Sequence, residues 1–166
     1  MANNDFDKFL SEREARQNQL RGTEEVVVQG AAGEWQNLKN ATKALTFGKT
    51  VEGNRLEWKP YSACYSDFLQ LKNVAAIFID RGIRNGVPQQ CSIRFDRNAS
   101  GPQGVFLEDK PPVPAEVWSL EPRAEGQNVI WHVKELGKNF TSTELASQVA
   151  IRLVEQFETY EAAFGQ

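Results

Sequence analysis

The sequence predicts an α+β domain in which a mostly antiparallel, curved sheet of about six strands is covered by a long C-terminal helix, with further helices at the N-terminus. Residues 142–164 carry apolar side chains at the three- and four-residue spacing of an amphipathic helix. Residues 55–135 instead break into short apolar or alternating runs separated by turn residues. With 166 residues, of which 40% are hydrophobic, the chain can bury one ordinary core.

The N-terminal region predicts a helical arm that precedes the main domain. A helix over residues 5–20 has a thin apolar stripe on one side, which Arg13 and Gln17 interrupt, and Gly22 is expected to end this helix. That side carries the large apolar residues Phe6, Phe9, Leu10 and Leu20. We therefore expect an arm over residues 1–22 and a single α+β domain over residues 23–166. The stripe is thin, so an outer helix, a loosely docked arm and a partner-binding segment all remain open.

Two more elements are expected before the sheet. Three consecutive valines within residues 24–29 favour a short strand, because β-branched residues suit strands. Within residues 35–45, mainly apolar side chains recur at helical spacing, and Gly48 follows. This predicts a second helix. Thr42 and Thr46 would suit a strand almost as well.

The central region predicts the sheet. Residues 74–79 are apolar throughout, which is typical of a strand buried on both faces. Residues 91–96 alternate between apolar and polar, which predicts a half-buried strand, and Asn85 and Gly86 predict a hairpin turn before it. Further strands are expected over 55–59, 67–72, 105–108, 116–120 and 128–136, with a connector at 109–115 and a turn at 121–127.

The C-terminal helix carries its own start signal. Thr141 and Glu144 have the spacing of a capping box, and Gly165 is placed to end the helix. Ile151 is an apolar residue on the otherwise polar side. It is either a single exposed side chain or a contact in a homodimer.

Several architectures share this order of elements. Helix-grip ligand binders hold a cavity between sheet and helix, PH-like barrels are capped by a terminal helix, and cystatin-like sheets wrap around a helix. No motif selects among these plans, and a plan of this kind does not by itself imply an activity.

Composition disfavours several classes of function. The net charge of -3 gives no dominant basic footprint, so nucleic-acid binding is disfavoured. The longest apolar run, residues 74–79, is far shorter than a membrane helix, and no leader segment is visible, so we expect a cytoplasmic protein. Cys64 and Cys91 are too few for a disulfide framework or a metal knuckle, and no cofactor motif occurs.

Four residues are the candidate binding residues. His132 is the only histidine and lies mid-strand, where imidazole could serve as a base or a ligand-binding group together with Arg94. Arg81 and Arg84 flank the hairpin turn, where guanidinium groups could hold an anion or a partner's acidic patch. A structural role for His132 and solvated loop charges at Arg81 and Arg84 are the preferred interpretations.

These features favour a non-catalytic binding or interaction domain. Its partner would be an apolar small molecule held between the long helix and the sheet, or a protein on the outer face of the sheet. The alternative is a small-molecule enzyme whose site is assembled around His132 and Arg94. The sequence does not decide between them.

Overall fold

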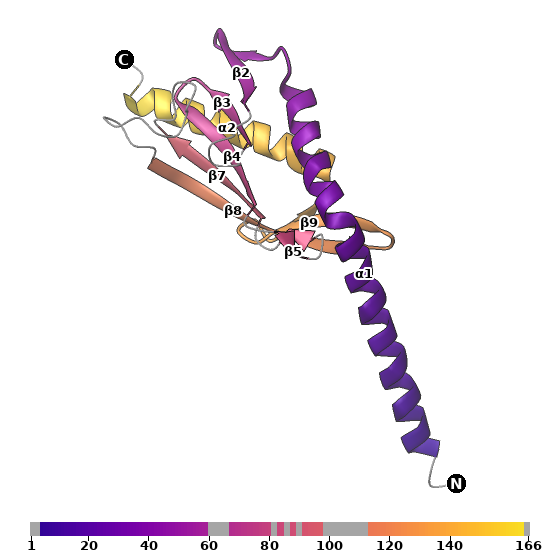
Figure 1. The fold of residues 1–166 in the computed structure, drawn as a ribbon. Helices are drawn as coiled ribbons and strands as arrows, with labels where there is room; N and C mark the ends of the chain where they lie inside the picture. Colours follow the sequence, from indigo (N-terminus) through magenta and orange to yellow (C-terminus); the bar gives the residue numbers. More distant parts are fainter. Residues whose placement is uncertain are drawn as a thin grey trace.

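The computed structural model describes residues 4–59, 67–80, 83–84, 87–88, 91–97 and 113–164. The elements within these ranges are α1 (Asn4–Thr46), β1 (Thr50–Val51), β2 (Asn54–Lys59), β3 (Asp67–Leu71), β4 (Val74–Asp80), β5 (Ile83–Arg84), β6 (Val87–Pro88), β7 (Cys91–Arg97), β8 (Val113–Glu125), β9 (Asn128–Val133), β10 (Lys138–Phe140) and α2 (Ser142–Phe164). Figure 1 shows their arrangement.

Eight of these strands form one antiparallel sheet in the order β1-β2-β3-β4-β7-β8-β9-β10. Neighbours in the sheet follow one another along the chain, except that the small β5–β6 pair is inserted between β4 and β7. The predicted α+β class with its antiparallel sheet is therefore confirmed. The sheet has eight strands, and the short edge strands β1 and β10 were not expected.

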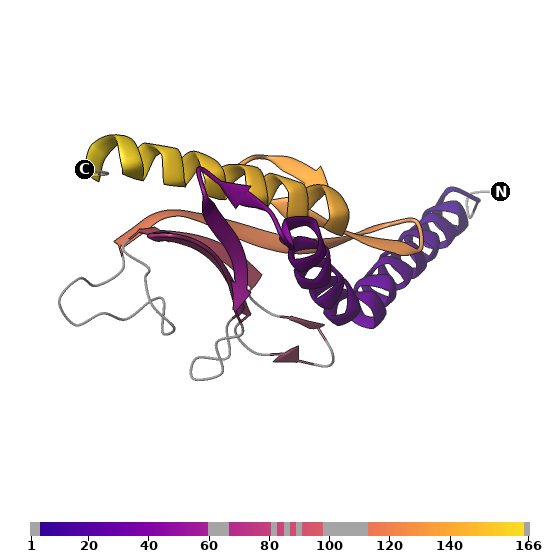
Figure 2. The same ribbon diagram turned by 90° about the horizontal axis from the view of Figure 1, so that it is seen from above.

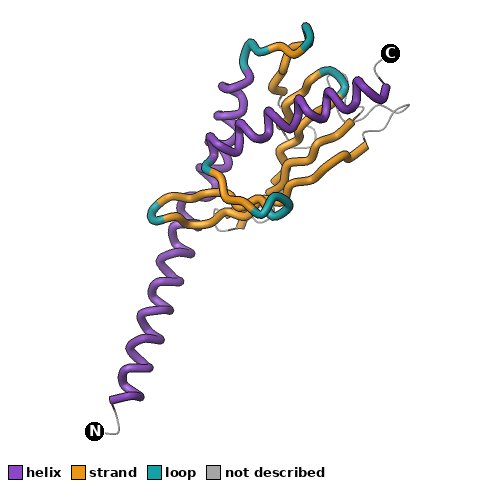
Figure 3. The backbone as a smooth tube through the Cα atoms, turned by 180° about the vertical axis from the view of Figure 1, so that it is seen from behind, coloured by secondary structure: helices purple, strands orange, loops and turns teal. Residues whose placement is uncertain are grey.

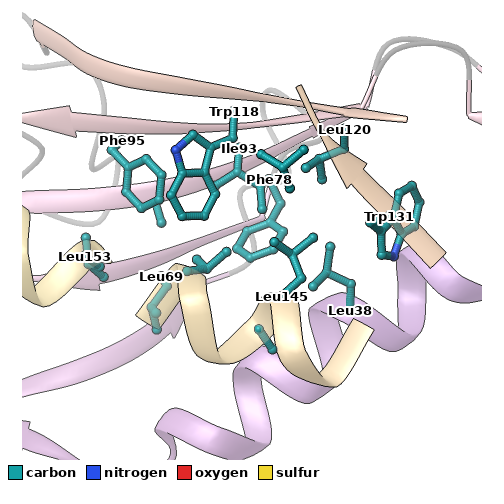
Figure 4. Close-up of a cluster of buried hydrophobic side chains, with 14 of the residues drawn as sticks. Leu38, Leu69, Phe78, Ile93, Phe95, Trp118, Leu120, Trp131, Leu145 and Leu153 are labelled. Carbon is teal, nitrogen blue, oxygen red and sulfur yellow. The ribbon is translucent and has the colours of Figure 1, made fainter. Parts of the chain in front are cut away.

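One face of the sheet carries the main core, which α2 and the C-terminal half of α1 cover (Figure 2). Leu145 and Leu153 of α2 and Leu38 of α1 are fully buried against sheet residues that include Phe78 and Trp118 (Figure 4). Side chains from both layers belong to a single buried cluster. The described side chains of α2 therefore pack directly on those of the sheet.

The predicted C-terminal helix is confirmed together with its cap. The backbone N–H of Glu144 donates to Thr141 Oγ1 at 3.2 Å, and the backbone N–H of Thr141 donates to Glu144 Oε1 at 3.0 Å. These are the two reciprocal bonds of a capping box. Hydrogen bonds from the backbone and the side chain of Thr141 lower the pKa of the Glu144 carboxyl, because they favour its charged form. Ile151 on the polar side is exposed, as both of its alternatives require.

The N-terminal elements are the largest correction to the sequence-based prediction. A single helix, α1, replaces the helix ending at Gly22, the strand over residues 24–29 and the helix over residues 35–45. Valine is disfavoured in a helix by less than about 1 kcal/mol and glycine by about 1 kcal/mol, so neither Gly22 nor the valine run is enough to end it. The predicted end is confirmed, because α1 ends at Thr46 and Gly48 follows with φ of +73°.

α1 divides into a packed half and a projecting half. Ala31 is fully buried and Val26 and Val27 are half-buried, whereas the described side chains before Val26 are exposed apart from Gln17. We call residues 5–25 the arm. The views in Figures 1 and 3 both show it extending away from the sheet, with no other segment beside it.

β8 is a second correction. It runs unbroken from Val113 to Glu125, although part of it was expected to be a connector and part a turn. Pro122 pairs with Trp131 of β9, and the described pairing with β7 ends earlier, at Leu120. A missing N–H at Pro122 therefore interrupts no described hydrogen bond to β7. The turn contracts to the residues around Gly126, whose φ is +61°.

The remaining strand predictions agree in part. β2, β3 and β4 lie where strands were expected, and residues 74–78 are buried as predicted for a strand covered on both faces. The strand expected over 128–136 ends at Val133, and Gly137 with φ of +63° leads into β10. The strand expected over 105–108 lies outside the described residues.

Two glycines of α1 give a matched test of how the helix seats on the sheet. A Cβ added at Gly30 would lie 2.8 Å from Cγ2 of Val129, whereas a Cβ at Gly33 would meet nothing within 4 Å. We expect Gly33→Ala to raise the free energy of unfolding by up to about 1 kcal/mol through helix propensity. Gly30→Ala gains the same propensity but should lose about 1–3 kcal/mol to overpacking against a stiff β-branched side chain. Urea unfolding of both variants measures the difference, and equal stabilities would contradict the contact.

Candidate functional site

His132 belongs to a polar pair on the face of the sheet opposite the main core. Its Nδ1 lies 2.7 Å from Oδ1 of Asn139, its direct neighbour on β10. This contact joins the imidazole ring to the side-chain amide of Asn139 and fixes the orientation of the ring. Glu121 of β8 is its neighbour on the other side. This geometry is that of an oriented, half-buried histidine.

Arg94 is held by a buried carboxylate. Its Nε lies 2.8 Å from Oδ1 of Asp96, whose side chain is fully buried. Asp96 Oδ2 has no hydrogen-bond partner among the described residues. A buried carboxylate without a cation is strongly unfavourable, so the first role of Arg94 is to compensate Asp96.

The strand register separates Arg94 from His132. Arg94 pairs with Val117 of β8, and His132 pairs with Glu121 of the same strand. Four residues along a strand correspond to about 13 Å, and β8 lies between the two side chains. A site that uses both residues would need a ligand long enough to cross β8.

The other two candidates are not placed in a site. Arg81 lies outside the described residues. Arg84 belongs to β5, but its side chain is not described. All four candidates therefore stay predictions, and the two whose side chains are described, Arg94 and His132, do not form one cluster.

A polar cluster that the sequence did not reveal joins α1 to the sheet. The indole N–H of Trp35 donates to Asp80 Oδ2 at 2.7 Å, and Lys39 Nζ lies 3.1 Å from Asp67 Oδ2. Cys91 lies opposite Asp80 in the pairing of β4 with β7. Trp35 and Asp80 are 45 positions apart, so no local spacing could have indicated this contact.

The chemistry of Cys91 argues against a catalytic thiol. Burial, reinforced by the negative charge of Asp80, raises its pKa to about 12, and Lys39 opposes this only in part. The thiol therefore stays protonated at neutral pH and is a poor nucleophile. Cys91 is buried in the main core, as a small apolar residue would be, whereas Cys64 lies outside the described residues.

A second unpredicted cluster fixes α2 on β8. Glu116 Oε1 accepts from Arg152 Nε at 2.7 Å and from Gln156 Nε2 at 3.1 Å, while Glu116 Oε2 accepts from the indole of Trp118. These hydrogen bonds raise the pKa of Arg152. Every donor comes from the chain itself, which indicates a structural cluster. Within the described ranges, no three or more His, Cys, Asp or Glu side chains are grouped so that they could hold a metal ion.

The arm presents the largest uncovered apolar stripe on the described helices. Its four large apolar side chains are between 43% and 63% exposed: Phe6, Phe9, Leu10 and Leu20. Leu20 and the buried Leu38 are 18 positions apart (38 − 20), which is five helical turns. The stripe that packs on the sheet therefore continues along the same side of α1 into the arm, where nothing described covers it.

A pocket of about 460 Å³ lies where α1 ends beside β2; we call it the α1–β2 pocket. Phe47, 83% exposed, and the half-buried Trp58 supply aromatic surface. Lys43 and Arg55 also line it, and neither forms an ion pair within the described part of the chain. The pocket therefore combines aromatic rings with uncompensated positive charge.

Ile151 lies in a separate, open hollow on the outer side of the two helices. Leu45 of α1 and Ala150 and Val154 of α2 line the hollow with it, and Glu155 and Glu158 supply negative charge at its rim. Its position is compatible with a surface contact. Nothing in the hollow resembles a set of catalytic groups.

Comparison with known proteins adds no assignment: no family model matches this chain, and neither a curated protein nor a solved structure matches it. In the part of the chain that the structure describes, no helix is both long enough and apolar enough to span a membrane. The functional assignment therefore depends on the geometry of the arm and the pockets.

Cys91 provides a direct test for thiol chemistry. With a pKa near 12, only a very small fraction of this thiol is ionised at pH 8, compared with a substantial fraction of an exposed cysteine. We expect iodoacetamide to modify Cys91 at least roughly a hundredfold more slowly in the native protein than in urea. Peptide mass spectrometry measures the modification of Cys91 separately from that of Cys64. Equal native and unfolded rates at Cys91 would contradict its burial.

Proposed function

We propose that this chain is a non-catalytic protein-interaction module and that its arm is the docking element. The single observation that carries this proposal is the uncovered apolar stripe on a helix that projects away from the body. Described side chains of α2 pack directly on those of the sheet, which is why we place the partner outside the sheet–helix interface.

The arm has physical reasons to require a partner. Isolated helices of about 20 residues are marginal in water, because most helical stability in proteins comes from packing an apolar face. Fully burying one large apolar side chain contributes roughly 1.5–3 kcal/mol. Covering Phe6, Phe9, Leu10 and Leu20 would therefore stabilise the arm considerably.

The charges of the arm favour a protein partner. Residues 5–25 contain four basic and six acidic residues, a balance of -2. Helices that lie on membrane surfaces are typically rich in Lys and Arg on their polar side. Nucleic-acid binding would likewise require an excess of basic side chains. A mixed-charge surface around an apolar stripe suits another protein, most simply another helix.

Photo-crosslinking tests the arm as the docking element. A benzophenone amino acid at Phe9, on the stripe, should give specific adducts in the cells that produce the protein. The same group at Ala15, on the opposite side of the arm and exposed, is the matched control. Leu20→Glu should reduce the Phe9 adducts at least roughly tenfold, because a charge on the stripe would be buried in the interface. Adducts of equal yield from both positions would contradict the proposal.

The α1–β2 pocket supports a second candidate function, the binding of a small anionic aromatic molecule. Lys43 and Arg55 would attract the negative charge, and Phe47 and Trp58 would contact the ring. This proposal uses different residues from the arm, so the two functions are compatible.

The dye 8-anilinonaphthalene-1-sulfonate, an anionic aromatic probe, tests this pocket. We expect Arg55→Glu to weaken its binding at least about fivefold, because the substitution replaces attraction by repulsion. Arg123→Glu is the matched control, since Arg123 lies on β8 and does not line the pocket. Fluorescence titration measures both affinities. Equal weakening in the two variants would indicate a general charge effect and would contradict a site at the pocket.

A further inference from the structure

We infer that the partner of the arm is the arm of a second copy of this chain, packed against it antiparallel. This inference rests on the proposed function, since it names the occupant of the same apolar stripe. The arguments are the spacing of the stripe, the charges beside it and the direction in which the arm leaves the body.

The spacing of the stripe suits a pair of helices. The positions that face one side of the arm alternate in steps of four and three residues, as in a coiled coil. They are Phe6, Leu10, Arg13, Gln17, Leu20 and Glu24. In an antiparallel pair centred near residue 15, Leu10 of each copy faces Leu20 of the other. Arg13 then faces Gln17 and Phe6 faces Glu24 of the second copy, so one Leu10–Leu20 layer lies on each side of a polar centre.

The charges beside the stripe specify the direction of pairing. Asp7, Glu14 and Arg21 follow one another at seven-residue steps on one flank of the arm. Antiparallel pairing brings this flank against the same flank of the second copy, with Asp7 opposite Arg21. Two-fold symmetry makes this attractive contact twice. Arg13 lies within reach of Glu14 of the second copy, which offsets the approach of the two Glu14 side chains.

Parallel pairing lacks these attractions. It would place each stripe residue against its own copy, so that Arg13 meets Arg13 and Glu24 meets Glu24. It would also bring Arg16 beside Arg21 of the other chain. Like charges at facing positions are unfavourable, so the sequence of the arm disfavours the parallel arrangement.

The shape of the molecule leaves room for the antiparallel pair. Residues 5–24 span about 30 Å as a helix, and the half-buried residues begin only at Val26. Figures 1 and 3 show the arm extending away from the sheet and from α2. In the antiparallel pair the two bodies lie at opposite ends of the paired arms, where they do not collide.

A charge exchange between Asp7 and Arg21 tests the inference. Sedimentation equilibrium of the full chain should show a dimer. Asp7→Arg alone and Arg21→Asp alone should each raise the dimer dissociation constant roughly tenfold, because each variant replaces two attractive contacts by two repulsive ones. The double variant should recover the wild-type value. An equimolar mixture of the two single variants should form a heterodimer in preference to either homodimer.

Three further variants serve as controls. Leu20→Glu should abolish the dimer, while Ala15→Glu introduces the same charge on the opposite side of the arm and should leave it intact. Ile151→Glu alters the other exposed apolar site and should also leave it intact. Circular dichroism and thermal unfolding should show an unchanged body in all of them, because these side chains are exposed.

Each contrary result overturns a different statement. A monomer at every concentration overturns the inference but not the proposed function, which stands if the Phe9 crosslinks identify another protein. A dimer that single charge changes leave unaltered overturns the antiparallel pairing. A dimer that Ile151→Glu abolishes and Leu20→Glu does not affect overturns the inference, and together with an absence of Phe9 crosslinks it overturns the proposed function as well.

Discussion

The packing of Trp35 determines how the rest of the molecule is arranged. Its ring lies 6.0 Å from that of Phe78 on β4 and 5.9 Å from that of Trp131 on β9. These strands are separated in the sheet by β7 and β8, so one side chain of α1 links both halves of the sheet. The apolar ring is buried while its N–H is satisfied by Asp80, the combination that makes a buried tryptophan favourable. The direction of α1, and therefore of the arm, follows from this contact.

The polar side chains in the interior mainly join elements to one another. Ser142 at the start of α2 accepts from the indole of Trp131 at 3.1 Å and donates to Glu34 of α1 at 2.6 Å, so three elements meet at one hydroxyl. Glu116 joins β8 to α2 in the same way. Groups that are fully engaged within the chain are not available to a substrate. The groups available to a partner therefore lie on the surface. They are the exposed apolar side chains of the arm and the cationic side chains of the α1–β2 pocket.

The sequence predicted elements whose signals are local. The C-terminal helix has a capping box and a wide apolar stripe, and the buried strand at residues 74–78 has a continuous apolar run; both were found. The predictions failed where a local preference was too weak to end an element. Three valines and Gly22 suggested a break in α1, but the helix continues through them, because valine and glycine each disfavour a helix by only about 1 kcal/mol or less. The contacts of Trp35 and Glu116 join residues 45 and 36 positions away, which no pattern along the chain could reveal.

α1 passes from the core into the arm as one helix, without a linker. A flexible linker would let a docked partner occupy many positions relative to the body, whereas a helix sets separation and rotation together, at about 1.5 Å and 100° per residue. The number of residues between Leu20 and Trp35 therefore determines both how far from the sheet a partner is held and which side of the sheet that partner faces.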